Sequence, residues 1–170
     1  GHQWWAHQVT SANTRGTTLL SEVPAQYSSY LVLKQTSSAK EIRTYLKYAL
    51  DQYLSGRKSE RRKELSLTQN ENQGYLHYYK GIMAMVALDD FIGTDSLSAA
   101  LKRFVRDKSY ATGPYPESVD IIPYLSAVTP DSLQYLVHDL FEDIVVYDNR
   151  ALSAECRRTE DGKYLTRLTV

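Results

Sequence analysis

The sequence predicts a mainly helical domain followed by a C-terminal β-hairpin. Apolar residues recur at helical spacing through most of residues 1–146, whereas apolar and polar residues alternate from Leu152 onward. The chain has 170 residues, 42% of them hydrophobic, which suffices for one helical core. We therefore expect a helical body over residues 1–146 and a hairpin over 147–170. Since a lone hairpin is marginally stable, we interpret it as the start of a truncated β-domain.

The first two predicted elements are separated by a polar loop. The short aromatic segment 2–9 is predicted to be the tail of a helix, and the loop spans Thr10 to Thr18. The next helix is expected from Ser21, its N-cap, to about Lys34. Pro24 then falls in the first turn, where its missing N–H has no intrahelical partner to lose.

A capping box marks the start of the third predicted helix. Ser38 and Glu41 have the spacing at which the serine caps forward and the glutamate reaches back. The apolar stripe that follows continues to Gly56. The charged, amide-rich stretch 57–73 lacks a clear period, so we expect a loop there with at most a short helix.

The remaining elements follow from apolar faces and start or stop signals. A buried helix is predicted over 74–91, and Gly93 ends it. Two further helices are predicted over 95–108 and 117–128. A last helix is predicted to begin with Thr129 as its N-cap and Pro130 at its first position. Asp161 and Gly162 supply the turn between the two alternating segments of the hairpin.

Charge and composition limit the classes of partner. The chain carries 20 Lys and Arg against 20 Asp and Glu, so no net field attracts a polyanion and we expect no nucleic-acid partner. No apolar run approaches the roughly 20 residues that cross a bilayer, so no membrane contact is expected from this chain.

The single cysteine, Cys156, does not indicate whether the protein occupies an oxidising or a reducing compartment. No signal peptide or initiator methionine is present, which suggests a piece of a longer protein.

Three short segments contain residues that can bind a metal ion or donate a hydrogen bond, and their order along the chain is recognisable. They are His2-Gln3-Trp4-Trp5, Leu20-Ser21-Glu22 and Tyr78-Tyr79-Lys80-Gly81. Together they resemble the zinc-site region of the aminopeptidase N-type gluzincins, where H-E-x-x-H lies on one helix, a glutamate lies on the next, and Y-x-K-G opens a buried helix. The resemblance implies that His2 and Glu22 are zinc ligands and that Tyr78 is catalytic.

The resemblance covers nearly the whole chain and implies its context. Several further strings look most like those of a bacterial branch of this family, in which the peptidase domain is fused to an ABC-2-type permease. They include Glu71-Asn72-Gln73 and Phe141-Glu142-Asp143, which leads into Tyr147-Asp148-Asn149-Arg150-Ala151. The implied fold is the C-terminal half of a thermolysin-like catalytic domain. The first zinc histidine and the general-base glutamate would lie before residue 1, and the partners would be a peptide substrate and the remainder of the parent chain.

Zinc chemistry gives these residues their expected roles. Zinc held by two imidazoles and a carboxylate keeps a position for water, whose pKa it lowers. Tyr78 would donate a hydrogen bond to the oxyanion of the tetrahedral intermediate. Glu22 follows His2 by 20 positions (22 − 2), one more than the commoner family pattern, and the Thr10–Thr18 loop can absorb the extra residue. With at most two ligands and no general base, we expect this chain alone to bind zinc weakly and to be inactive.

Simpler interpretations of the same residues remain open. His2 could be a remnant of cloning, Glu22 a first-turn acid on its helix dipole, and Tyr78 one more packed aromatic among 14 tyrosines. His77 and His138 have no identifiable partner. The alternative function is a non-catalytic helical interaction module of a transporter-associated protein, a degenerate peptidase. The hairpin edge also predicts self-association between copies.

Overall fold

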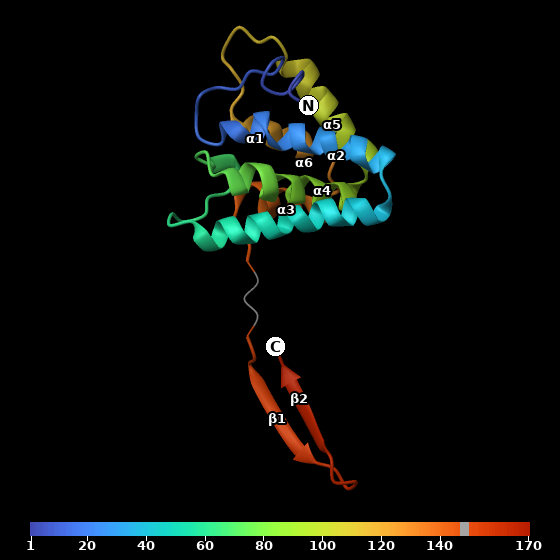
Figure 1. Ribbon diagram of the computed structural model, residues 1–170. Helices are drawn as coiled ribbons and strands as arrows, with labels where there is room; N and C mark the ends of the chain where they lie inside the picture. Colours follow the sequence, from blue (N-terminus) through green and yellow to red (C-terminus); the bar gives the residue numbers. More distant parts are fainter. Residues whose placement is uncertain (147–149) are drawn as a thin grey trace.

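The computed structural model describes residues 1–146 and 150–170 and is mainly helical, with a two-stranded antiparallel hairpin at the C-terminus (Figure 1). This confirms the predicted helical class and the hairpin. In the first part of the chain the elements are α1 (Thr17–Ser21), α2 (Val23–Thr36), α3 (Ala39–Ser59), η1 (Leu67–Gln69), η2 (Tyr75–Lys80) and α4 (Gly81–Ile92). They are followed by α5 (Thr94–Lys108), η3 (Ser118–Ile121), α6 (Ile122–Ser126), η4 (Asp131–Leu133), α7 (Gln134–Val137), η5 (His138–Glu142), β1 (Ser153–Arg158) and β2 (Tyr164–Thr169).

The N-terminal segment forms turns, so the predicted helix tail over residues 2–9 is wrong. The amides of Trp4 and Trp5 both donate to the Gly1 carbonyl, at 3.0 and 3.2 Å, but Ala6 has a positive φ of 76° and interrupts any helix there. A helix of so few residues does not repay its nucleation cost. Trp5 instead anchors the segment by burying its ring, which stacks on Phe104 of α5.

The second helix begins earlier than predicted and is interrupted. Helical structure starts at Thr17 after Gly16, which has a φ of 75° and lies so close to the Thr68 carbonyl that a Cβ would overlap it. The predicted start at Ser21 is therefore wrong, because Ser21 is the last residue of α1. Pro24 lies in the first turn of α2, as expected, and its lack of an N–H explains the break at Glu22.

The capping box of α3 is confirmed. The Ser38 amide donates to Glu41 Oε2 at 2.7 Å, and the Glu41 amide donates to Ser38 Oγ at 3.4 Å. The helix continues past Gly56 to Ser59, and Gly56 lies directly against the Tyr75 side chain of η2, where a Cβ would overlap it. The expected loop with a short helix over 57–73 is otherwise present, with η1 as the short helix.

The predicted buried helix over 74–91 is confirmed in position, but its first part is a π-helix. η2 continues directly into α4, and Gly93 ends α4 with a φ of 86°. In Figure 1, α4 runs between α2 and α3, and α5 also packs against α4. The largest buried side chains of this core include Tyr27, Leu76, Ile82, Met85, Leu88, Leu97 and Phe104.

The later helices fall in the predicted segments, with two corrections: Thr129 is not the N-cap, and Pro130 precedes the first helical residue, Asp131, where the sequence predicted it at the first position. The Thr129 hydroxyl donates back to the Leu125 carbonyl at 2.8 Å, and the next turn begins as a 3₁₀ helix with Asp131. The Gln134 side chain donates to the Thr129 carbonyl at 2.6 Å and stabilises this reversal. The polar groups at this turn therefore bond to carbonyls of the preceding helix.

The hairpin pairs as the alternation predicts, from Ser153 opposite Thr169 to Arg158 opposite Tyr164. All residues of both strands are exposed, and Figure 1 shows the hairpin outside the helical core. The predicted domain boundary at 146/147, like the family string at Tyr147 to Asn149, touches residues outside those described. Self-association through the strand edges stays a prediction.

Candidate metal centre

Glu22 is held at the junction between α1 and α2. Its amide donates to the Thr18 carbonyl at 2.9 Å, and its own carbonyl accepts from the Gln26 amide at 2.9 Å. The backbone of Glu22 is thus fixed from both helices, although neither helix contains it. Its side chain is 20% exposed, so the carboxylate is accessible from one side.

His2 approaches this carboxylate from the N-terminal turns. The distance from His2 Nε2 to Glu22 Oε2 is 3.5 Å, and His2 Nδ1 lies 3.3 Å from the Trp5 carbonyl oxygen. A carbonyl only accepts, so the Nδ1 contact places a proton on Nδ1. A histidine whose Nδ1 is bonded to a backbone carbonyl has Nε2 available for another partner, as metal-binding histidines commonly do.

The separation of the two atoms fits a shared metal ion. Typical N–H···O hydrogen bonds are about 2.7–3.2 Å long, so a contact of 3.5 Å between His2 and Glu22 is long for one. Zinc binds imidazole nitrogen and carboxylate oxygen at about 2.0–2.2 Å, which places two ligands of a tetrahedral site about 3.3–3.5 Å apart. The donor types and their spacing are thus compatible with two ligands of one zinc ion, and the same distance also lies within the range of a His–Glu ion pair.

Tyr78 faces the same carboxylate from η2. The negative charge of Glu22 is the largest cause that raises the pKa of the Tyr78 hydroxyl, and burial and hydrogen bonding to Glu22 act in the same direction. The ring is held between His77, with centroids 4.3 Å apart, and Tyr79, at 6.4 Å. The hydroxyl is protonated at neutral pH with or without this shift and can therefore donate a hydrogen bond.

The three residues predicted from the sequence therefore lie together, although they come from three separate segments. His2 belongs to the N-terminal turns, Glu22 to the α1–α2 junction and Tyr78 to η2. Across residues 1–146 and 150–170, no group of three or more His, Cys, Asp or Glu side chains is placed to hold a metal ion. The described residues thus bring together one imidazole, one carboxylate and one phenol hydroxyl at this position.

Sequence reasoning missed His77 as a neighbour of the site. Its side chain is buried, and burial lowers its pKa while the charge of Glu22 opposes that shift. Its Nδ1 lies 3.0 Å from Asn70 Nδ2, and Asn70 also donates to Thr18 Oγ1 at 2.9 Å. The sequence position directly before Tyr78 was the only available signal, because the Asn70 contact depends on the tertiary fold.

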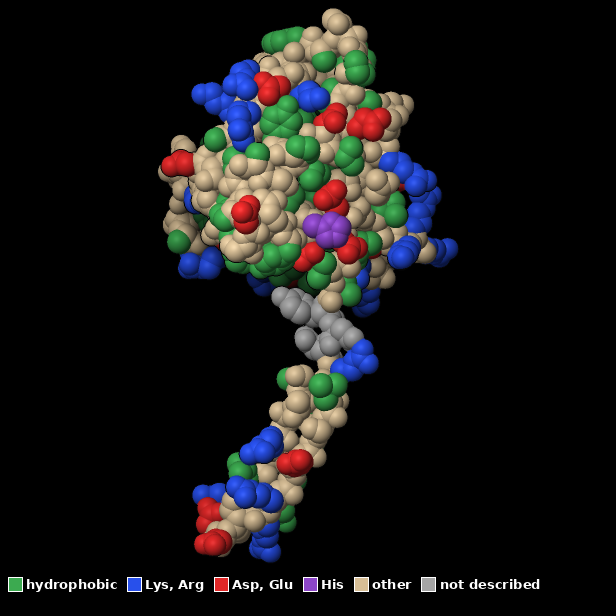
Figure 2. Space-filling view, turned by 180° about the vertical axis from the view of Figure 1, so that it is seen from behind, with side chains coloured by type: hydrophobic (Ala, Val, Ile, Leu, Met, Phe, Trp, Pro, Cys, Tyr) green, Lys and Arg blue, Asp and Glu red, His purple; other side chains and the backbone are tan. Residues whose placement is uncertain are grey.

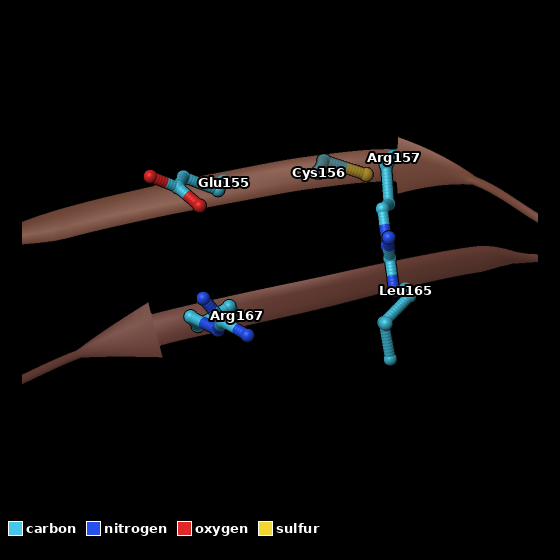
Figure 3. A pocket seen from close by; sticks show the side chains of 5 residues that line it. All are labelled: Glu155, Cys156, Arg157, Leu165 and Arg167. Carbon is cyan, nitrogen blue, oxygen red and sulfur yellow. The ribbon is translucent and has the colours of Figure 1, made fainter.

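Other surface features do not compete with this site. The hollow in Figure 3, about 340 Å³, lies on the hairpin, where Glu155 and Arg167 face each other across the two strands. Its lining residues are all exposed, including Cys156, whose Sγ accepts from Thr166 Oγ1 at 3.6 Å. Figure 2 shows acidic and basic side chains interspersed over the face it presents. None of the described helices has the length and hydrophobicity needed to cross a bilayer.

Comparisons with protein families, curated proteins and solved structures found no match to this chain.

Proposed function

We propose that this chain is the C-terminal part of the catalytic domain of a zinc metallo-aminopeptidase with a thermolysin-like fold, which hydrolyses N-terminal peptide bonds. The observation that supports it best is the convergence of His2 Nε2 and Glu22 Oε2, 3.5 Å apart, with the Tyr78 hydroxyl facing the same carboxylate. This is the set of residues that the family resemblance names, and the sequence separates its members widely.

In this proposal His2 and Glu22 hold the zinc ion. Zinc bound in such a site polarises a substrate carbonyl and lowers the pKa of a bound water. The contact of His2 Nδ1 with the Trp5 carbonyl orients the imidazole so that Nε2 is available as a ligand. The helical hydrogen bonds on both sides of Glu22 fix its backbone position.

Tyr78 stabilises the charge that develops during peptide hydrolysis. As the water oxygen adds to the carbonyl carbon, negative charge develops on the carbonyl oxygen, and the Tyr78 hydroxyl donates a hydrogen bond to it. A preorganised donor of this kind contributes about 10²–10³ in rate. The phenol is protonated at neutral pH whether or not its pKa is shifted, so it can act as the donor.

The proposal assigns the other functional groups to the parent protein. The first zinc histidine and the general-base glutamate belong to its upstream segments, and the hairpin begins its next β-domain. The parent is a bacterial protein joined to a membrane permease, and its substrate is a peptide. The chain by itself is inactive and holds zinc weakly.

The test is a pair of substitutions in the intact parent protein. Tyr78→Phe removes only the hydroxyl and lowers aminopeptidase turnover by about 10²–10³ with zinc content unchanged. Tyr79→Phe is the matched control, because the neighbouring ring packs edge-on against Tyr48 at 6.0 Å. Its turnover stays near that of the wild type. Normal turnover of the Tyr78→Phe enzyme would exclude Tyr78 from the mechanism.

The sequence immediately before Gly1 in the parent separates the two candidate functions. A histidine and glutamate four and three positions before His2 complete H-E-x-x-H and support the peptidase. Any other pair supports the non-catalytic helical interaction module. Metal analysis of the intact protein then provides an independent check, because a module without the motif contains no stoichiometric zinc.

A further inference from the structure

The longest helix, α3, lies at one edge of the helical body and has a single fully buried residue, Ala49, among its 21 residues (Figure 1). Its inner side packs on the core through four partly buried residues, Ile42, Tyr45, Leu46 and Tyr53. The other side of the helix remains exposed in the part of the chain that the structure describes.

The exposed side of α3 carries a stripe of cations with two leucines in the middle. Positions three or four apart share one face of a helix, and this spacing joins six exposed residues, Lys40, Arg43, Lys47, Leu50, Leu54 and Lys58. The stripe is about 27 Å long. Leu50 and Leu54 are 40% and 51% exposed. Together with Arg61 and Arg62, which follow the helix and are exposed, we call this stripe the basic face of α3.

The two acids that follow α3 in the sequence do not neutralise the basic face. Glu64 is buried and pairs with Arg57 and Lys80. Glu60 accepts from the backbone amide of Arg62 at 3.2 Å. Among the described residues, three cations at this end of the basic face therefore make no ion pair, namely Lys58, Arg61 and Arg62.

The acids of α3 itself are also engaged. Glu41 accepts from the Ser38 amide in the capping box, and Asp51 pairs with Lys47 at 2.6 Å. Over residues 39–64, eight Lys and Arg stand against four Asp and Glu, although the net charge of the whole chain is zero. The neutral composition thus conceals a local cationic surface.

A cationic stripe with exposed leucines fits the surface of an anionic lipid bilayer. Each Lys or Arg near such a surface strengthens binding by about fivefold. Leucine side chains enter the boundary between headgroups and acyl chains, and the long stems of lysine and arginine let their charges reach the headgroup phosphates. A nucleic-acid backbone attracts the same cations but offers the two leucines no apolar phase.

We propose that the basic face of α3 binds the surface of an anionic phospholipid bilayer, with α3 parallel to the membrane plane and Leu50 and Leu54 at the headgroup–acyl boundary. The sequence-based expectation of no membrane contact considered only apolar runs that cross a bilayer, and α3 is not such a helix. The inference is independent of the proposed peptidase function, because the basic face contains none of the candidate site residues.

The first experiment measures co-sedimentation of the 170-residue chain with vesicles of phosphatidylcholine, alone or mixed with phosphatidylglycerol. We expect binding only to the anionic vesicles, and its loss at an ionic strength of about 1 M, where charges are screened beyond roughly 3 Å. The double variant Lys58→Gln, Arg61→Gln should bind these vesicles about 25-fold more weakly. Circular dichroism verifies that it is folded.

The double variant Lys102→Gln, Arg103→Gln is the matched control. It removes two exposed cations from α5, which Figure 1 shows on the opposite side of the helical body from α3, and changes the net charge equally. We expect it to bind like the wild type. Equal losses in the two double variants, equal binding to the two kinds of vesicle, or no binding to the anionic vesicles would overturn the proposal.

The second experiment separates a membrane from a nucleic acid. The double variant Leu50→Gln, Leu54→Gln keeps every charge and should bind anionic vesicles about tenfold more weakly. Val32→Gln, at an exposed position of α2, is the control and should bind like the wild type. Undiminished vesicle binding of the leucine variant would contradict the proposal, and so would tighter binding of the wild type to a mixed-sequence single-stranded RNA than to the anionic vesicles.

Discussion

Two carboxylates beside η2 have opposite surroundings. Glu64, 6% exposed, lies 2.7 Å from Lys80 Nζ and 3.0 Å from Arg57 Nε, and it accepts from the Tyr53 hydroxyl at 3.0 and 3.2 Å. Glu22 is more open, and among the described residues only the imidazole of His2 lies within ion-pair distance of it. Lys80 and Tyr78, two residues apart in the sequence, thus contact different carboxylates.

This difference separates a structural carboxylate from a candidate metal ligand. The charge of Glu64 is already balanced by two cations and a hydroxyl, and no accessible position is left for another cation. Such a buried pair mainly constrains the structure, because removing one partner leaves an uncompensated charge. Glu22 has an imidazole opposite it, an exposed side and a hydroxyl nearby. The Lys80–Glu64 pair fixes η2, and η2 in turn presents Tyr78 to Glu22.

The largest effect on stability is expected from breaking the Lys80–Glu64 pair. Lys80→Met removes one cation from a buried carboxylate and should lower the free energy of unfolding by about 3 kcal/mol, measured by chemical denaturation. Lys47→Met is the control, since Lys47 pairs with Asp51 at 2.6 Å on an exposed face of α3. That exposed pair contributes about 0.5 kcal/mol or less. Equal losses in the two variants would contradict the distinction.

A second prediction compares the two carboxylates directly. Glu64→Gln leaves Lys80 and Arg57 without their counter-charge and should cost about 2 kcal/mol. Glu22→Gln changes a carboxylate that is partly solvated and whose nearest partner is 3.5 Å away, so the cost should stay within about 0.5 kcal/mol. Denaturant midpoints of the two variants provide the measurement. A larger loss for Glu22→Gln would identify Glu22 as the structural residue.

The smallest predicted effect is a pH dependence from Tyr53. Burial, and then the charge of Glu64, raise the pKa of Tyr53 from 10.0 to about 12. The neutral hydroxyl is thus favoured in the folded state, so its stabilisation is complete below pH 10 and is lost as the pH rises through about 12.

Thermal melts between pH 9 and 12 of the wild type and Tyr53→Phe measure this contribution. The variant should lose less stability over this range than the wild type. Tyr164→Phe, at an exposed hairpin position, is the control and should follow the wild type. Parallel profiles for the wild type and Tyr53→Phe would show that the hydroxyl makes no stabilising contact with Glu64.

Much of the fold could be predicted from local signals. The capping box at Ser38, the stop at Gly93 and the turn at Gly162 depend on one or a few neighbouring residues, and all three are present. The errors have different causes. Gly16 fits against the distant Thr68 and so begins α1 early, whereas Thr129 bonds back to Leu125, only four residues earlier, where an N-cap was expected.

The candidate site was predictable only in part. The family resemblance was based on the order of His2, Glu22 and Tyr78 in the chain. The structure places these three side chains together. Their roles stay predictions. His77 was missed because its partner Asn70 is oriented by Gln73 and Thr18, contacts that exist only after folding.

The sequence by itself determined the helical class, the hairpin and the order of the chemical groups, because apolar periodicity, caps and turns act over a few residues. Only the tertiary structure decided that Glu22 remains accessible while Glu64 is enclosed by cations, and that Asn70 donates to His77 Nδ1. Burial and the direction of a hydrogen bond depend on segments far apart in the chain, and no local pattern encodes them.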